Sequence, residues 1–155
     1  MSDATPQTLI EELGQQLGLG PLRLDDQGFC ALRFDDTLLI NIQYWADGEQ
    51  LVLFADLGPP AGGVKLYPVL LKANLFWRTT LGATLSLSED DPPHVIIALQ
   101  QACQSLDAGQ LSTLLERFVN TVEDWTEVVK NATYGADLED DDTLITSSDM
   151  SMMRV

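Results

Sequence analysis

The sequence predicts an α+β fold: a helix, a three-strand antiparallel meander, a second helix, a two-strand hairpin and a third helix, in that order. Two observations lead to this order. Apolar residues recur at helical spacing in some segments and at every second position in others, and short turn sequences separate the latter. Hairpins flanked by helices, without an internal repeat, are typical of the α+β class. Of 155 residues, 45% are hydrophobic, so we expect one domain with one core over residues 1–133.

The first helix is expected to begin at Thr5 and Pro6, since Thr is a good N-cap and Pro suits the first helical turn. Four apolar residues then follow at helical spacing: Leu9, Ile10, Leu13 and Leu17. Gly18 and Gly20 end the pattern, so this is a short amphipathic helix.

The meander is expected between residues 29 and 55. Residues 29–34 and 38–44 alternate on either side of the turn at 35–37, which predicts a hairpin with one apolar face. After Asp47-Gly48, a third strand at 51–55 carries apolar side chains on both faces.

The middle helix is expected from Pro68 to Trp77, with Gly82 closing it. Its apolar residues lie nearly all round the axis, so we expect it to be buried on more than one side. Residues 84–88 and 95–99 alternate around a turn rich in acids and prolines, which predicts the second hairpin.

The last helix follows Asp107 and Gln110, whose spacing resembles a capping box. Its apolar residues form one long stripe: Leu111, Leu114, Leu115, Phe118, Val122, Trp125 and Val129. This stripe predicts a long helix that buries one side.

The chain is strongly acidic, with 24 Asp and Glu against 8 Lys and Arg, a formal charge of -16. Such a surface repels phosphate backbones and anionic lipid, so neither nucleic acid nor a membrane is an expected partner. Residues 134–155 carry six acids and a single base, Arg154, and lack helical or strand periodicity. We expect them to form a mobile acidic tail.

Cys30 and Cys103 are the only cysteines, and their apolar neighbours favour two reduced, buried thiols over a disulfide framework. The N-terminus lacks the pattern of a secretory signal, and no apolar run reaches membrane-spanning length. The cytoplasm is therefore the expected location.

Residues typical of catalysis are scarce. His94 is the only histidine, which leaves no recognisable zinc pattern, and the residues from Gly58 to Gly63 lack the ending of a phosphate-binding loop. A dyad of His94 with either cysteine stays open at this point, whereas the acid pairs sit where solvated acids are expected. We expect no enzyme, no metal and no cofactor.

Some apolar residues exceed what one core needs. Phe29, Leu39, Val52 and Phe54 lie on strand faces that the main apolar set does not use. In a domain with few helices, such a surplus indicates either a binding surface or further core packing.

From about residue 5 to about residue 130 the chain resembles the class I type III secretion chaperones, the CesT-like or Tir chaperone family. The resemblance rests on the Leu-rich first helix and on four further segments: Cys30-Ala31-Leu32; Leu70-Leu71-Lys72-Ala73-Asn74-Leu75; Gly82-Ala83-Thr84-Leu85-Ser86-Leu87; and Leu115-Glu116-Arg117-Phe118-Val119 with Trp125. The acidic tail lies outside it.

The resemblance implies a cytoplasmic homodimer that binds the N-terminal segment of a secreted effector and helps to deliver it to the secretion ATPase, without ATP or metal of its own. It implies a dimer interface at Leu71, Asn74, Leu75 and Leu85, where Asn74 either fixes the pairing or is an ordinary helix-face residue. It also implies that the effector binds apolar patches and adds a strand at a sheet edge, with five candidate contacts: Leu13, Phe29, Leu39, Val52 and Phe54.

Two other functions remain as alternatives. An acidic inhibitor or immunity protein that imitates nucleic acid would bind a basic partner in a salt-sensitive way. A small enzyme would depend on His94 or on a carboxylate pair.

Overall fold

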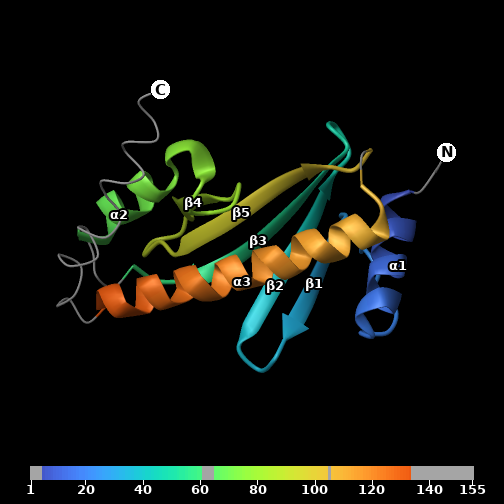
Figure 1. The fold of residues 1–155 in the computed structure, drawn as a ribbon, viewed down its shortest axis with the longest axis horizontal. Helices are drawn as coiled ribbons and strands as arrows, with labels where there is room; N and C mark the ends of the chain where they lie inside the picture. The colour runs from blue at the N-terminus through green and yellow to red at the C-terminus, as the bar shows by residue number, and fades with distance from the viewer. Residues whose placement is uncertain (1–4, 61–64, 105, 134–155) are drawn as a thin grey trace.

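The structure, a computed structural model, describes residues 5–60, 65–104 and 106–133 (Figure 1). The predicted tail at 134–155 lies outside this range. The elements are α1 (Pro6–Leu17), β1 (Phe29–Phe34), β2 (Leu38–Trp45), β3 (Gln50–Gly58), α2 (Leu66–Ala73), the 3-10 turn η2 (Leu75–Trp77), β4 (Thr84–Leu87), β5 (Val95–Ala102) and α3 (Ala108–Thr133). The predicted α+β class and element order are therefore confirmed.

The five strands form one antiparallel sheet in the order β1-β2-β3-β5-β4. The meander and the second hairpin are joined because β3 pairs with β5 from Gln50↔Ala102 to Gly58↔Val95. This pairing puts β1 and β4 at the two edges of the sheet. The sequence predicted both hairpins but not their union.

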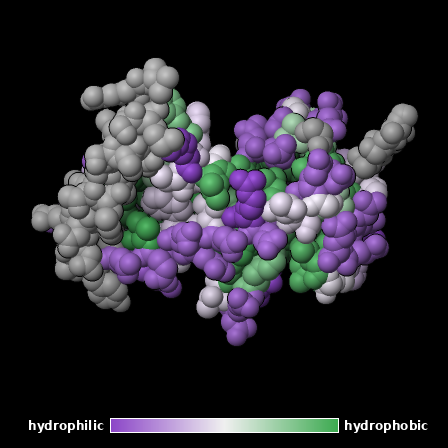
Figure 2. All heavy atoms as spheres, in the orientation of Figure 1, coloured by the Kyte–Doolittle hydropathy of each residue, from purple (hydrophilic) through white to green (hydrophobic). Residues whose placement is uncertain are grey.

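The core lies on one face of the sheet. Its strand residues alternate along the chain and are all buried: Cys30, Leu32, Ile40, Ile42, Leu51, Leu53, Ala55, Ile97 and Leu99. In Figure 1, α3 runs across the sheet, α1 lies beside the start of α3, and α2 lies next to β4 at the other end. The predicted stripe of α3 is buried, apart from Leu114, which is half-buried. The outward side of α3 is largely hydrophilic (Figure 2).

The first helix has the predicted ends. Thr5 Oγ1 accepts a hydrogen bond from the Thr8 N–H at 3.2 Å, and Pro6 occupies the first turn. Gly18 ends the helix at a φ of 68°, a conformation that glycine adopts without steric cost. None of the helices in the described ranges has the length and apolarity to cross a membrane.

The prediction for the middle helix is wrong in two respects. Helix α2 begins at Leu66, two residues before Pro68, and ends at Ala73. Beyond it, Phe76 and Trp77 have φ values of 55° and 54°, which no α-helix can contain. The expected burial on several sides is also absent within the single chain, since Leu71 is 70% exposed.

The capping box of α3 gives a stability prediction. Asp107 Oδ1 accepts from the Gln110 N–H at 2.8 Å, and Gln110 Oε1 accepts from the Asp107 N–H at 2.9 Å. Replacing Asp107 by Ala removes the first bond and should lower the free energy of unfolding by about 1 kcal/mol. Asp107→Asn keeps an equivalent acceptor and should stay close to wild type. Urea denaturation at matched protein concentration measures both, and equal losses in the two variants would contradict the assignment of this cap.

Candidate functional site

One face of the meander carries four of the five predicted effector contacts. Phe29, Leu39, Val52 and Phe54 alternate with the core residues and therefore lie on the opposite face of the sheet. The Phe29 and Phe54 rings lie 6.4 Å apart at 49° and are half-buried, and Leu39 is 41% exposed, whereas Val52 is buried at 8% exposure. We call these four residues the apolar face.

The fifth predicted contact, Leu13, is 0% exposed and packs in the core with Leu9 and Ile10. The helical period identified it as an apolar position correctly. The helical period alone does not show which side of α1 meets the core. In the structure the side with Leu13 meets it, so Leu13 has no surface to offer a partner.

The edge formed by β1 is partly open. Tyr44 N–H donates to the Gly28 carbonyl at 2.8 Å, so in the alternating antiparallel pattern the N–H and C=O groups of Phe29, Ala31 and Arg33 point away from β2. Asp25 already binds both groups of Phe29: its N–H donates to the Phe29 carbonyl at 2.9 Å, and its Oδ1 accepts from the Phe29 N–H at 3.0 Å. Within the described part of the chain no hydrogen bond occupies the outward groups of Ala31 and Arg33, and both residues are exposed.

The region around α2 and β4 exposes six large apolar side chains. They are 41 to 70% exposed and comprise Leu71, Leu75, Phe76, Trp77, Leu81 and Leu87. We call this set the α2–β4 patch. A patch of this kind on a small chain is typical of a protein–protein contact.

The four residues predicted for the dimer interface divide into two pairs. Leu71 and Leu75 belong to the exposed patch, whereas Leu85 is buried at 3% exposure. Asn74 is half-buried and its side chain binds the backbone of Leu85: Nδ2 donates to the carbonyl at 2.9 Å, and Oδ1 accepts from the N–H at 2.8 Å. Periodicity in the sequence does not predict this contact, because it joins residues on different elements.

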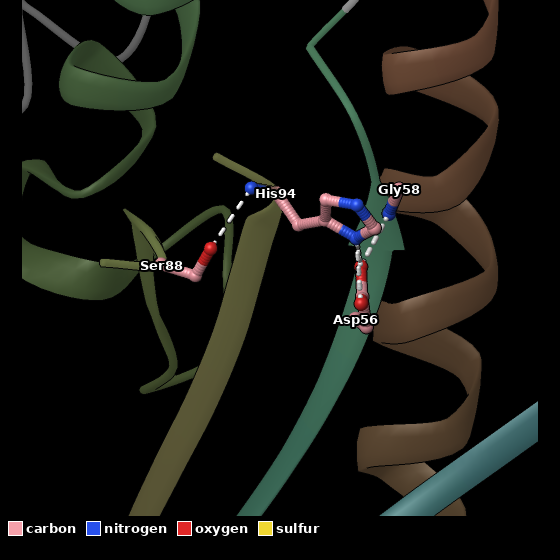
Figure 3. Close-up of polar contacts among 4 residues, drawn as sticks. All are labelled: Asp56, Gly58, Ser88 and His94. Atoms are coloured by element: carbon pink, nitrogen blue, oxygen red, sulfur yellow. Dashed lines mark hydrogen bonds and ion pairs between the residues drawn. The ribbon is translucent and has the colours of Figure 1, made fainter. Parts of the chain in front are cut away.

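His94 immediately precedes β5 and pairs with Asp56 on β3 (Figure 3). Its Nδ1 is 2.7 Å from Asp56 Oδ2, and Asp56 Oδ1 accepts from the Gly58 N–H at 2.8 Å, across the irregularity in the β3–β5 register. Ser88 Oγ accepts from the main-chain N–H of His94 at 2.9 Å, so it does not contact the imidazole ring. The three side chains fix the strand ends and do not form a nucleophile–base relay.

Neither Cys–His dyad forms. Strands β2 and β3 lie between β1, which holds Cys30, and β5, which His94 precedes. Three strand spacings of about 4.8 Å therefore keep Cys30 at least about 14 Å from His94. Cys103 follows the far end of β5, about 30 Å away at about 3.4 Å per residue. The described residues also contain no group of three or more His, Cys, Asp or Glu side chains that could hold a metal ion.

Residues 8–126 match the Tir chaperone protein (CesT) family. A protein of Chlamydia pneumoniae is 29% identical over 121 residues, covering 76% of this chain and 90% of its own length. The Yersinia pestis type III secretion chaperone SycH, solved in complex with a stable fragment of YscM2, is 25% identical, with 76% of this chain and 97% of that chain covered and a TM-score of 0.62. The ExsC–ExsE complex contains a chain that is 22% identical, with 79% of this chain and 92% of that chain covered and a TM-score of 0.70.

The two thiols give a prediction about reactivity. Burial raises the pKa of Cys30, and burial followed by the charge of Glu49 raises the pKa of Cys103. A raised pKa leaves less thiolate at any given pH, so both thiols should react with a disulfide reagent at pH 8 more slowly than in the guanidinium-unfolded chain. Half-exposed Cys103 should react before buried Cys30. Single Cys→Ser variants separate the two rates, and a Cys30 rate equal to that of the unfolded chain would contradict its placement.

Proposed function

The chain belongs to the Tir chaperone protein (CesT) family, and we propose that it is a type III secretion chaperone that holds the N-terminal segment of a secreted effector in an extended form. The observation that supports this proposal is the open β1 edge beside the apolar face. Together they offer hydrogen bonds to a backbone and apolar contacts to its side chains. An extended, non-globular chain can use both at once.

The backbone of the effector adds to β1. Ala31 and Arg33 each present an N–H and a C=O group at the edge, and exposed neighbours leave the approach clear. A strand added there would pair through its own backbone and so accept many sequences.

The side chains of the effector contact the apolar face. Phe29 lies on β1 itself, Leu39 on β2 and Phe54 on β3, so the face extends inward from the open edge. Val52, also on β3, is buried at 8% exposure, so it offers an effector little surface of its own. Alternate side chains of an added strand point to this face. Apolar residues at every second position of the effector segment therefore fit it best.

Both kinds of contact are non-covalent and use groups that the chain itself presents, so we propose that the chaperone needs no nucleotide, metal or other cofactor to make them. It releases the effector when the export apparatus takes over the segment, and the secretion ATPase is the partner we propose for that transfer.

A second copy of the chain covers the α2–β4 patch. Leu71, Leu75, Phe76 and Trp77 lie close together in sequence and are 45 to 70% exposed, which is the kind of apolar surface that a partner usually covers. A two-fold pairing would bury the same patch of both copies against each other. The homodimer thereby supplies the additional burial that the sequence predicted for the middle helix.

Effector binding through the β1 edge can be tested with Ala31→Pro. Proline removes the outward N–H of residue 31 and obstructs an incoming strand, but no bond to β2 is lost because that N–H points away from the sheet. Co-expression with the N-terminal segment of the protein encoded by the adjacent reading frame should give a co-purifying complex for wild type and more than about tenfold less complex for the variant.

The matched control is Ala31→Val, which keeps the N–H group and should retain the complex. The complex should also persist at about 1 M NaCl, where the screening length is about 3 Å. Loss of wild-type binding at that salt concentration would favour the acidic-inhibitor alternative instead. Equal binding by the Pro and Val variants would exclude the β1 edge.

The dimer can be tested with Leu71→Glu. Leu71 is 70% exposed in the single chain, so the change should leave the fold intact while it places a charge within the proposed contact. We expect light scattering after size exclusion to show a dimer for wild type and mainly monomer for the variant. Leu19→Glu, at an exposed leucine beside α1, serves as the control and should stay dimeric. A wild-type monomer would refute the proposed interface.

A further inference from the structure

The two edges of the sheet differ in how far their backbone groups are already bonded. Ser88 N–H donates to the His94 carbonyl at 2.8 Å, so the alternation along β4 turns the N–H and C=O groups of Ala83, Leu85 and Leu87 away from β5. These outward groups would pair with any strand that approached the β4 edge. Whether these groups are already hydrogen-bonded therefore decides whether a strand can add to the β4 edge.

Side chains and backbone of the preceding segment fill most of the β4 edge. Asn74 takes both groups of Leu85, at 2.8 and 2.9 Å, in the way that a neighbouring strand would. Thr80 takes both groups of Ala83: its carbonyl accepts from the N–H at 3.2 Å and its Oγ1 donates to the carbonyl at 2.5 Å. Of the three outward-facing positions, Leu87 alone has no such partner among the described residues.

The irregular course of the chain after α2 makes this contact possible. The helix ends at Ala73, and Phe76 and Trp77 then adopt left-handed φ values that large side chains rarely take. A continuous helix through Trp77 would carry the chain straight on. The break instead turns residues 78–82 back toward β4, with the Asn74 side chain between the two elements.

We propose that Asn74 closes the β4 edge of the sheet and thereby confines strand addition, by an effector or by another copy of the chain, to the β1 edge. This assignment rests on the proposed function only in naming the effector as the added strand. It makes Asn74 a positioning residue, because its amide group occupies the hydrogen bonds that an added strand would require. A second copy covering the α2–β4 patch must then bind through side chains, not through a continuous sheet.

The closure can be measured without an effector, by amide hydrogen exchange in the full chain. In wild type the Leu85 amide should exchange more slowly than the outward-facing Leu87 amide. Asn74→Ala should raise the Leu85 rate by about tenfold, the effect of losing one hydrogen bond at a strand edge. Asn120→Ala changes an exposed asparagine on α3 and should alter neither rate.

The confinement can be measured by sedimentation velocity over a range of protein concentrations, at about 1 M NaCl to screen the negative charge. Asn74→Ala should form species larger than wild type, because an opened β4 edge can pair with β1 of the next copy. Adding Ala31→Pro to Asn74→Ala should return the wild-type size. If Asn74 had only a structural role, its loss could destabilise the chain. It would not produce larger species that disappear when Ala31→Pro closes the distant β1 edge.

Two results would each overturn the proposal: a wild-type Leu85 amide that exchanges as fast as that of Leu87, or an Asn74→Ala chain with unchanged Leu85 exchange and no species larger than wild type. The first uses the native chain and so holds even if the variant fails to fold. Because neither readout includes an effector, failure of effector binding would count against the proposed function and leave this test intact.

Discussion

The pairing of β3 with β5 determines where every proposed contact of this protein lies. It joins two hairpins into one sheet and so decides that β1 and β4, which are far apart in sequence, are the two edges. Its irregular end, between Asp56 and Gly58, is held by His94 and by the Ser88 contact. If the hairpins were separate, β3 and β5 would expose edges of their own, and neither β1 nor β4 would be distinguished. The one histidine of the chain therefore serves the architecture, although its exposed pair with Asp56 contributes little free energy by itself.

The features that the sequence predicted are those set by neighbouring residues. The caps at Thr5 and Asp107 and the hairpin turns each depend on side chains a few positions apart, and all of them form. The missed features depend on residues distant in sequence. The end of α2 is an example: its apolar pattern continues past Ala73, but the Asn74 bond to Leu85 and the φ values that follow come from packing against β4. Leu13 and Leu85 show the same limit, since periodicity marks them as apolar without saying whether core or partner covers them.

The acidic composition suits a chain with this surface. Residues 1–133 carry 18 acids and 7 bases, so the charge of the α+β domain is strongly negative even without the segment at 134–155. Like charge opposes the approach of copies through their apolar face or open edge, and it acts at longer range than hydrophobic contact does. The same charge disfavours a nucleic acid as partner. In the proposed dimer, burial of the apolar α2–β4 patch opposes this screened, dispersed repulsion.

The open edge is short, and its length limits what the backbone can contribute to effector binding. Ala31 and Arg33 present about four hydrogen-bonding groups, and at a net value near 1 kcal/mol each these give about 4 kcal/mol, equivalent to roughly millimolar affinity. A chaperone that must hold its effector until export needs tighter binding. The difference has to come from apolar contacts next to the edge, where burying one large apolar side chain contributes about 1.5 to 3 kcal/mol. Selection among effectors therefore falls to the apolar face, because the backbone contacts are the same for any sequence.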